Sequence, residues 1–439
     1  MRTSKRTVTV VGASLAAAAM VLTACGGGGG DQSGESGTSG GGAAKGFEGK
    51  GPFTYVQGKD NAGTIQPMLD QWNEAHPDEK VTMIELSTEA DQQRQAMINN
   101  AQTKSDAYCV MSVDNIWVPE FAARGWIDEI PESEFPKEKF LAPVWETGTY
   151  RDKVFAIPAS SDGGLLYYRK DILAKAGVTE APTSWEDMEA AWEKVKALPE
   201  YASIGGYAGQ FYKYEGFTVN AAEAINTAGG VFLDADLKPA ASSPEAEKGL
   251  QRLVDGFDSG FIPQEALTYK EEEGRAAFEA GRVLFYRNWP YQYSLTQKAI
   301  GDDAFGFTAL PTVDGKPGVS SLGGHNLGIS SYCQNKASAL EFVKWYTDGP
   351  QQQLQLKEAS LAPAWTELYE DEANIKDFPY LPALEESIKN AVPRPRAVQY
   401  GDTTAAIQDS LWPVLQGQTT PADALKALDE KLGALGTGN

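Results

Sequence analysis

The sequence predicts an α/β fold divided into two lobes. Segments with strand-like and helix-like hydrophobic periodicity alternate along the chain, which is typical of parallel sheets whose strands are connected by helices. The chain has 439 residues, more than the roughly 250–300 residues at which a single core stops growing. Its composition, 42% hydrophobic and 22% charged, is that of a globular protein and excludes a collagenous, mucin-like or largely disordered chain.

The first elements follow this alternation closely. A strand is predicted over 52–57, a helix over 62–75, a strand over 81–86, a helix over 89–103 and a strand over 107–113. The first helix is predicted because Ile65, Met68, Leu69 and Trp72 fall on one face. Asp114 and Trp117 stand just past the third strand, and ligands of open α/β sheets bind outside the carboxyl ends of strands.

Further elements are predicted along the rest of the chain. A helix begins near Thr183 and Glu186, which fit a capping box, and another begins at Ser243 with proline at its first position. Strands are predicted over 153–158, 283–286 and 327–332, and the last third is mainly helical apart from 392–396.

Charge and residue counts exclude several classes of function. The formal net charge is −22, the wrong sign for a nucleic-acid binder or for attraction to anionic lipids. The chain has only two histidines and three cysteines, which are too few to build a typical zinc site or iron–sulfur cluster. No cofactor and no metal are therefore expected. The common hydrolase, nucleotide and metalloprotease motifs are absent from the sequence. A pair of carboxylates for glycoside hydrolysis has no short signature and stays open.

The N-terminus predicts export. Residues 1–24 have a basic start, a short apolar run and small residues before Cys25, as in a secretory signal. The tetrad ending at Cys25 resembles a bacterial lipobox, in which this cysteine becomes the lipidated first residue. Residues 25–50 contain twelve glycines among polar residues, and we expect a flexible tether there. No later stretch reaches transmembrane length.

Loops at predicted strand ends repeatedly combine acids, amides and aromatic residues. Sugar hydroxyls need planar hydrogen-bonding partners, and the apolar face of a pyranose packs on an aromatic ring. This mixture favours a carbohydrate site. The segments that carry it lie at 114–122, 162–171, 214–216, 287–291, 323–327 and 394–396.

With these segments, the lipobox and the tether, the chain resembles the extracellular solute-binding proteins of bacterial sugar ABC transporters, most closely the trehalose/maltose-binding subgroup. The resemblance covers the chain after residue 50. It implies a periplasmic-binding-protein-like (type II) fold with sugar bound between two lobes, which close by a hinge. Its three crossings would lie near 154–159, 327–332 and 360–365. The lobes would comprise 51–157 with 328–362, and 158–327 with 363–439.

The resemblance also implies the residues that contact the ligand. Trp289 would stack on a sugar ring, Gly324 would let backbone approach the ligand, and Tyr291 belongs to the same set. The residues that would hydrogen-bond sugar hydroxyls are Asp114, Asp162, Glu215 and Arg396, with Asp60, Asn61 and Arg94 as further candidates. His325 also belongs to the set but departs from the pattern, because many relatives have tryptophan at this position, and the loss of that ring puts disaccharide stacking in doubt.

Cys109 and Cys333 lie in apolar runs that predict buried strands in an oxidising compartment. Either a disulfide or two inert thiols fit the sequence, and a bridge would be worth roughly 3–5 kcal/mol. The lobe arrangement that the resemblance implies brings both strands into the first lobe, which supports the disulfide.

The resemblance finally implies the setting of the protein. We expect a monomeric, non-enzymatic receptor, lipid-anchored through Cys25 on the extracellular face of the membrane or in the periplasm. It would deliver trehalose or maltose to a membrane permease driven by a separate ATPase. Another oligosaccharide, an amino sugar or an osmolyte is an alternative ligand, and a secreted lipoprotein glycosidase is an alternative class.

Overall fold

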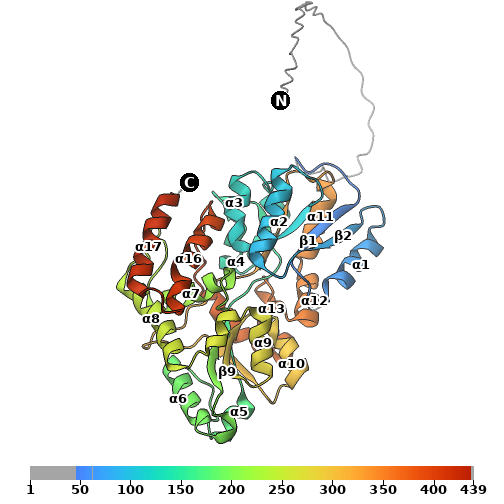
Figure 1. Cartoon of the computed structure of the whole chain (residues 1–439). Coiled ribbons are helices and arrows are strands. Elements are labelled where there is room, and N and C mark those ends of the chain that lie inside the picture. The colour runs from blue at the N-terminus through green and yellow to red at the C-terminus, as the bar shows by residue number, and fades with distance from the viewer. Residues whose placement is uncertain (1–45, 62, 437–439) are drawn as a thin grey trace, which may run out of the picture. The chain divides into compact units, whose positions relative to one another are not determined.

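A computed structural model describes residues 46–61 and 63–436 of the chain. The predicted signal sequence 1–24, the lipidation site Cys25 and most of the predicted tether lie outside these residues. No helix within the described ranges is long and apolar enough to cross a membrane. Two separate sheets, each covered by helices, form two lobes (Figure 1), which confirms the predicted two-lobe α/β class.

The first lobe is built on a five-stranded sheet. Its strands are β2 (Val81–Glu85), β1 (Phe53–Gln57), β3 (Val110–Asp114), β11 (His325–Ile329) and β6 (Ala156–Pro158), in that spatial order. β1 is parallel to β2 and β3, whereas β11 is antiparallel to both of its neighbours. The sheet is therefore mixed rather than wholly parallel, because β11 enters it from the other lobe.

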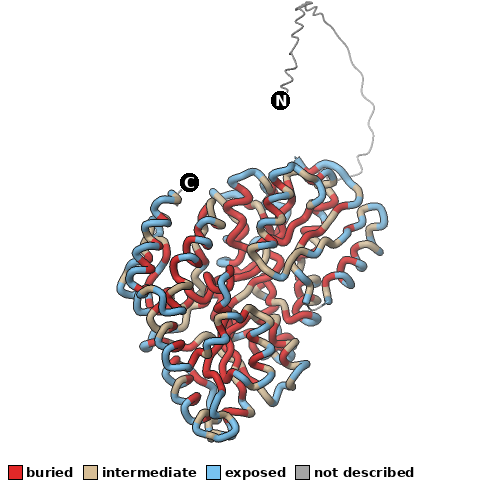
Figure 2. Tube along the Cα trace, viewed as in Figure 1, coloured by how far each residue is buried: buried red, intermediate tan, exposed pale blue. Residues whose placement is uncertain are grey.

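The second lobe is built on a four-stranded sheet. Its strands are β10 (Gly306–Ala309), β7 (Leu165–Tyr168), β9 (Val283–Asn288) and β8 (Gly205–Ala208), in that spatial order. β8 is parallel to β9, and β7 is antiparallel to β9 and β10. All residues of β3 and β9 are buried, and Figure 2 shows buried segments running through the middle of both lobes.

Helices cover both sheets. Those packed on the first lobe are α1 (Ile65–Ala75), α2 (Ala90–Gln102), α3 (Val118–Ala123), α4 (Ala142–Thr147), α11 (Lys336–Tyr346) and α12 (Gly349–Ala359). Those of the second lobe are α5 (Lys170–Lys175), α6 (Trp185–Lys196), α7 (Glu215–Ala228), α8 (Pro244–Ser259), α9 (Glu271–Glu279), α10 (Gln292–Ile300), α15 (Leu381–Lys389), α16 (Tyr400–Leu415) and α17 (Pro421–Leu435). The remaining elements are the hairpin β4 (Thr149–Tyr150) and β5 (Lys153–Val154), and the short helices α13 (Glu367–Glu370) and α14 (Glu372–Asp377).

Local sequence signals explain where several helices begin. The face predicted for α1 is buried as expected, including Leu69 and Trp72. α8 begins at Pro244 after its N-cap Ser243, as predicted. The capping box of α6 lies one residue later than predicted, because Ser184 and Asp187 form it and not Thr183 and Glu186. Asp187 also accepts a hydrogen bond from the Thr183 hydroxyl at 2.8 Å, so Thr183 and Ser184 both form hydrogen bonds at the N-terminus of α6.

Three chain segments lie together between the lobes: residues 159–164 lead from β6 to β7, residues 310–324 lead from β10 to β11, and residues 360–365 follow α12. The first two crossings were predicted near 154–159 and 327–332, and they differ because β6 and β11 themselves belong to the first sheet. The first two pair through backbone hydrogen bonds between Asp162 and Gly323, at 2.9 and 3.2 Å. The third is fixed by the Ser161 amide and hydroxyl, which donate to the carbonyls of Ala362 at 3.0 Å and Pro363 at 2.7 Å. Because the first two segments connect one sheet to the other and the third is hydrogen-bonded to the first, the lobes meet at a short, hydrogen-bonded junction.

The end of the predicted tether packs on the first lobe. Phe47 is buried in the core, and the amide of Ala337 at the start of α11 donates to the carbonyl of Gly49 at 3.0 Å. The flexible tether expected over 25–50 was therefore wrong for residues 46–50, because the one aromatic residue of this segment finds a hydrophobic site.

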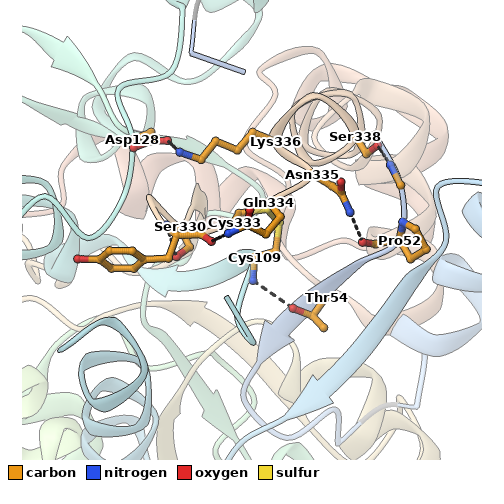
Figure 3. Close-up of a disulfide and its surroundings, with 12 residues drawn as sticks. Pro52, Thr54, Cys109, Asp128, Ser330, Cys333, Gln334, Asn335, Lys336 and Ser338 are labelled. Atoms are coloured by element: carbon orange, nitrogen blue, oxygen red, sulfur yellow. Dashed lines mark hydrogen bonds and ion pairs between the residues drawn. A yellow bond between two sulfur atoms is a disulfide. The ribbon is translucent and has the colours of Figure 1, made fainter. Parts of the chain in front are cut away.

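A disulfide joins Cys109, directly before β3, to Cys333, shortly after β11 (Figure 3). Both cysteines are buried. The Ser330 amide donates to the carbonyl of Cys109 at 2.8 Å, and the Cys109 amide donates to the hydroxyl of Thr54 at 3.1 Å. The bridge thus fastens the far end of β11 within the first lobe.

Candidate functional site

A cavity of about 480 Å³ lies between the two lobes. Strands β1 and β3 of one sheet and β9 of the other end toward it, the position in which α/β sheets form ligand sites. Its volume lies within the roughly 300–1,000 Å³ of small-molecule pockets. The lining includes nine of the eleven residues predicted to contact a ligand: Asp60, Asn61, Asp114, Asp162, Glu215, Trp289, Tyr291, Gly324 and His325.

The cavity also contains residues that the sequence analysis missed. Lys270 and the acids Glu271, Glu272 and Glu273 at the start of α9 line it, and so does Arg394. The acidic run of α9 was visible in the sequence but has the ordinary composition of a helix start. Nothing in the sequence indicated that this helix start faces the cleft.

Arg394 forms the electrostatic centre of the site. Its guanidinium donates to Asp114 of the first lobe at 2.7 and 3.2 Å and to Glu215 of the second lobe at 2.5 Å. Glu215 also accepts hydrogen bonds from Thr404, at 2.7 Å, and from Tyr400. Burial raises the pKa of Glu215 to about 7, although Arg394 acts in the opposite direction. One buried cation thus links two carboxylates across the lobes.

Other contacts also cross the cleft. The Glu215 amide donates to the carboxylate of Asp91, which lies in α2 of the first lobe, at 3.2 Å. Lys270 of the second lobe pairs with Glu89, directly before α2. The two lobes are therefore held together beside the cavity by a hydrogen bond and an ion pair.

Asp162 presents a carboxylate that is free for a ligand. It lines the cavity, and no residue of the described ranges donates a hydrogen bond to its side chain. Burial raises the pKa of Asp162 to about 7, while Arg287 favours its ionised form. A ligand hydroxyl would supply the missing hydrogen-bond donor.

Trp289 and Tyr291 follow the end of β9. The Trp289 ring lies over the guanidinium of Arg287, with 3.9 Å between the Arg287 Cζ and the ring centroid. The Tyr291 hydroxyl donates to Glu272 at 2.9 Å. Carboxylates beside an aromatic ring are the groups that a polar, ring-shaped ligand requires.

Comparison with known proteins identifies the family. Residues 56–353 match the model of the bacterial extracellular solute-binding proteins. The chain belongs to this family. A relative from Deinococcus radiodurans, named "Probable ABC transporter-binding protein", is 31% identical over 366 residues, covering 81% of this chain and 86% of the relative.

The names of two other similar proteins include a sugar. A maltotriose-binding protein of Pyrococcus abyssi is 25% identical over 308 residues, which cover 68% of this chain and 64% of that protein. The solved structure of maltose-bound T. maritima MalE3 is 28% identical, with a TM-score of 0.82 over 88% of this chain and 99% of that one. The names of these relatives describe binding and not catalysis.

In this solute-binding protein, Gly324 and His325 line the inter-lobe cavity at the point where the segment from β10 reaches β11. Gly324 has a φ of +113°, and a Cβ there would lie 2.5 Å from the carbonyl oxygen of Ser160. A side chain at this position would therefore meet the backbone of the segment that contains Ser160, so only glycine fits here. His325 pairs in register with Asp114 across β11 and β3, and burial lowers its pKa, which favours a neutral imidazole in the cavity.

Two predicted arginines lie outside the lining of the cavity. Arg94 pairs with Glu120, with 3.1 Å between its Nε and a carboxylate oxygen, and Arg396 donates to the carbonyl of Thr149 at 2.5 Å. Arg394, two residues before Arg396, takes the position at the site. In a regular extended segment, residues two apart share a face, so periodicity alone could not distinguish Arg394 from Arg396.

Replacing Asp162 by asparagine should weaken ligand binding and stabilise the ligand-free protein above pH 7. Its pKa of about 7 exceeds the usual 3.8, so the folded chain retains a proton that the unfolded chain releases. The wild type should therefore lose stability between about pH 4 and 7. Asp162→Asn should reduce this loss of stability between about pH 4 and 7. It should also weaken ligand binding at least tenfold, which corresponds to about 1.4 kcal/mol.

Thermal unfolding and calorimetric binding from pH 4 to 8 would measure both effects. Asp106→Asn on the exposed surface is the matched control. Unchanged affinity together with an unchanged pH profile would contradict the role of Asp162.

Proposed function

We propose that this solute-binding protein is the sugar receptor of an ABC importer and that it captures an α-glucoside disaccharide of the trehalose or maltose type. The ligand would be held between the lobes and delivered to a membrane permease. The observation that carries the proposal is the presence, in one inter-lobe cavity, of a tryptophan ring and a half-buried carboxylate, that of Asp162, which has no hydrogen-bond partner among the described residues.

The similar proteins support a sugar as the ligand. MalE3 has maltose bound, and the P. abyssi relative is named for maltotriose. The residues proposed to contact the sugar are Trp289 as a stacking surface and Asp162 as a hydrogen-bond acceptor, with Asp60, Asn61, Tyr291 and His325 around them. Asp114 and Glu215 would contact the sugar only through the carboxylate lone pairs that Arg394 leaves free.

The setting of the receptor is part of the same proposal. We place the lobes at 51–157 with 328–362 and at 158–327 with 363–439, except that Pro158 and residues 325–327 belong to β6 and β11 of the first sheet. Removal of residues 1–24 would leave Cys25 as a lipidated first residue, which holds a monomer at the extracellular face of the membrane. The three segments that meet near Ser161 would act as the hinge.

A thermal-shift screen of the purified protein against mono-, di- and oligosaccharides tests the ligand. A sugar at about 100 times its dissociation constant stabilises the folded state by about 2.7 kcal/mol, a rise of about 3 °C for a chain of this size. We expect this rise with trehalose or maltose and none with an equal concentration of an unrelated polyol.

Other outcomes select among the alternatives. A rise only with a longer oligosaccharide, an amino sugar or an osmolyte would retain the receptor and replace the ligand. No rise with any sugar would overturn the sugar assignment. Repeated turnover of aryl glucosides by the purified protein would overturn the receptor assignment in favour of a glycosidase.

A further inference from the structure

The Trp289 ring rests on a charged group that no ligand can reach. The guanidinium of Arg287 lies 3.9 Å from the ring centroid, measured from its Cζ, and Arg287 is 0% exposed. A cation at this distance from an indole face is attracted by the electrons of the ring. One side of the ring is thus occupied from within the protein.

Arg287 itself is held on several sides. Its Nε donates to Glu223 at 2.8 Å, its Nη2 donates to the second oxygen of Glu223, and its Nη1 donates to Gln210 at 3.1 Å. The Gln210 amide donates back to the carbonyl of Arg287 at 3.0 Å. A Cβ added to Gly164 would lie 2.8 Å from Nη2, so backbone also packs against the guanidinium. The cation has no freedom to move away from the ring.

The same network reaches the segments that join the lobes. Glu223 accepts a hydrogen bond from the Ser321 amide at 3.0 Å, and the Ser320 hydroxyl accepts one from the Gly164 amide at 2.6 Å. Residues 320 and 321 belong to one crossing and Gly164 to another. The Trp289 ring is therefore fixed, through Arg287 and Glu223, to the junction between the lobes.

Backbone fixes the edge of the ring as well. A Cβ on Gly323 would lie 3.1 Å from Cζ3 of Trp289 and 2.9 Å from the Cβ of Asp162. Gly323 thus packs against both the Trp289 ring and the side chain of Asp162. The orientation of the ring relative to Asp162 depends on a cation behind the ring and a glycine at its edge.

A buried ion pair contributes little to stability compared with apolar residues of the same volume. The pair of Arg287 and Glu223 is therefore poorly explained as a stabilising element. We propose that Arg287, supported by Glu223, is a positioning residue that holds the Trp289 ring in the orientation required for ligand stacking. This inference rests on the proposed function, because the ligand must be a ring that stacks on Trp289.

The test is a double-mutant cycle with maltose or trehalose, whichever raises the melting temperature. Arg287→Met alone would leave Glu223 buried without a countercharge, so it is combined with Glu223→Gln, which keeps an acceptor for Ser321. The pair is introduced into the wild type and into Trp289→Leu. We expect the pair to lower the affinity at least tenfold in the wild type and less than twofold in Trp289→Leu.

An equal loss in both backgrounds, or no loss in either, would overturn the inference, because a role independent of the ring acts equally with and without it. The matched control is Arg169→Met with Asp171→Asn. This is another buried arginine paired with an acid in the second lobe, with 2.7 Å between the charged atoms. It should leave the affinity unchanged.

A ligand-free measurement separates this inference from the proposed function. The near-UV circular dichroism of the wild type minus that of Trp289→Leu isolates the signal of the fixed ring. The Arg287→Met, Glu223→Gln pair should remove at least half of this difference, and an unchanged difference would overturn the inference. If no sugar binds the wild type, the proposed function fails while this measurement still tests the ring.

Discussion

Arg394→Met should greatly weaken ligand binding and strongly destabilise the protein. Removal of this cation leaves Asp114 and Glu215 facing each other in the cleft without a countercharge, and Arg394 is only 3% exposed in its side chain. Breaking a buried ion pair by removing one partner costs about 3–5 kcal/mol. We expect the affinity for the sugar to fall more than 100-fold, measured by calorimetry, and the melting temperature to fall with it.

Two further variants make this result interpretable. Arg394→Lys keeps the charge but loses the planar fork that reaches both carboxylates, so it should fold and bind with intermediate affinity. Arg396→Met lies outside the cavity lining and should bind within twofold of the wild type. If Arg396→Met lost binding while Arg394→Met retained it, the assignment of the site arginine would be reversed.

Removal of the disulfide should lower the free energy of unfolding without changing ligand affinity. Cys109 and Cys333 are 224 residues apart in the chain, and in the chain-entropy model a loop of this size is worth about 3–5 kcal/mol. Neither cysteine lines the cavity. The urea midpoint of Cys109→Ser, Cys333→Ser should fall, while sugar affinity should stay within twofold.

The reduced wild type is the matched control for this pair, because it has the same residues apart from the bond. It should unfold at the same urea concentration as the double variant. Equal midpoints for the oxidised and reduced wild type would contradict a stabilising bridge.

Much of the local structure could be predicted because it depends on neighbours in the chain. The buried face of α1 repeats Ile65, Met68, Leu69 and Trp72 at helical spacing. Ser243 caps the start of α8 by accepting a hydrogen bond from the amide three residues later, and Pro244 directly follows it. The antiparallel direction of β11 could not be predicted in this way. The direction of β11 is set by the chain returning from the second lobe to the first sheet, and the residues of β11 contain no local signal of that direction.

The candidate site shows the same division. Asp114, Asp162, Trp289 and His325 were found because polar and aromatic residues directly after or before strands mark sheet edges. The role of Arg394 was missed because it lies in an irregular segment that joins α15 to α16. Such a segment has no fixed period, so only packing decides which of its residues face the cavity.

The sequence by itself determined the class of the fold and the family, and it indicated nine of the residues that line the cavity. Periodicity, strand-end polarity and family motifs are local patterns, which is why they could be read from the chain alone. The tertiary structure alone decided which carboxylates are free and which are paired. Asp114 and Glu215 are bound to Arg394, 280 and 179 positions away, whereas Asp162 has no such partner within residues 46–61 and 63–436. Ion pairing depends on distance in space, and residues this far apart in the chain are brought together only by the packing of the two lobes.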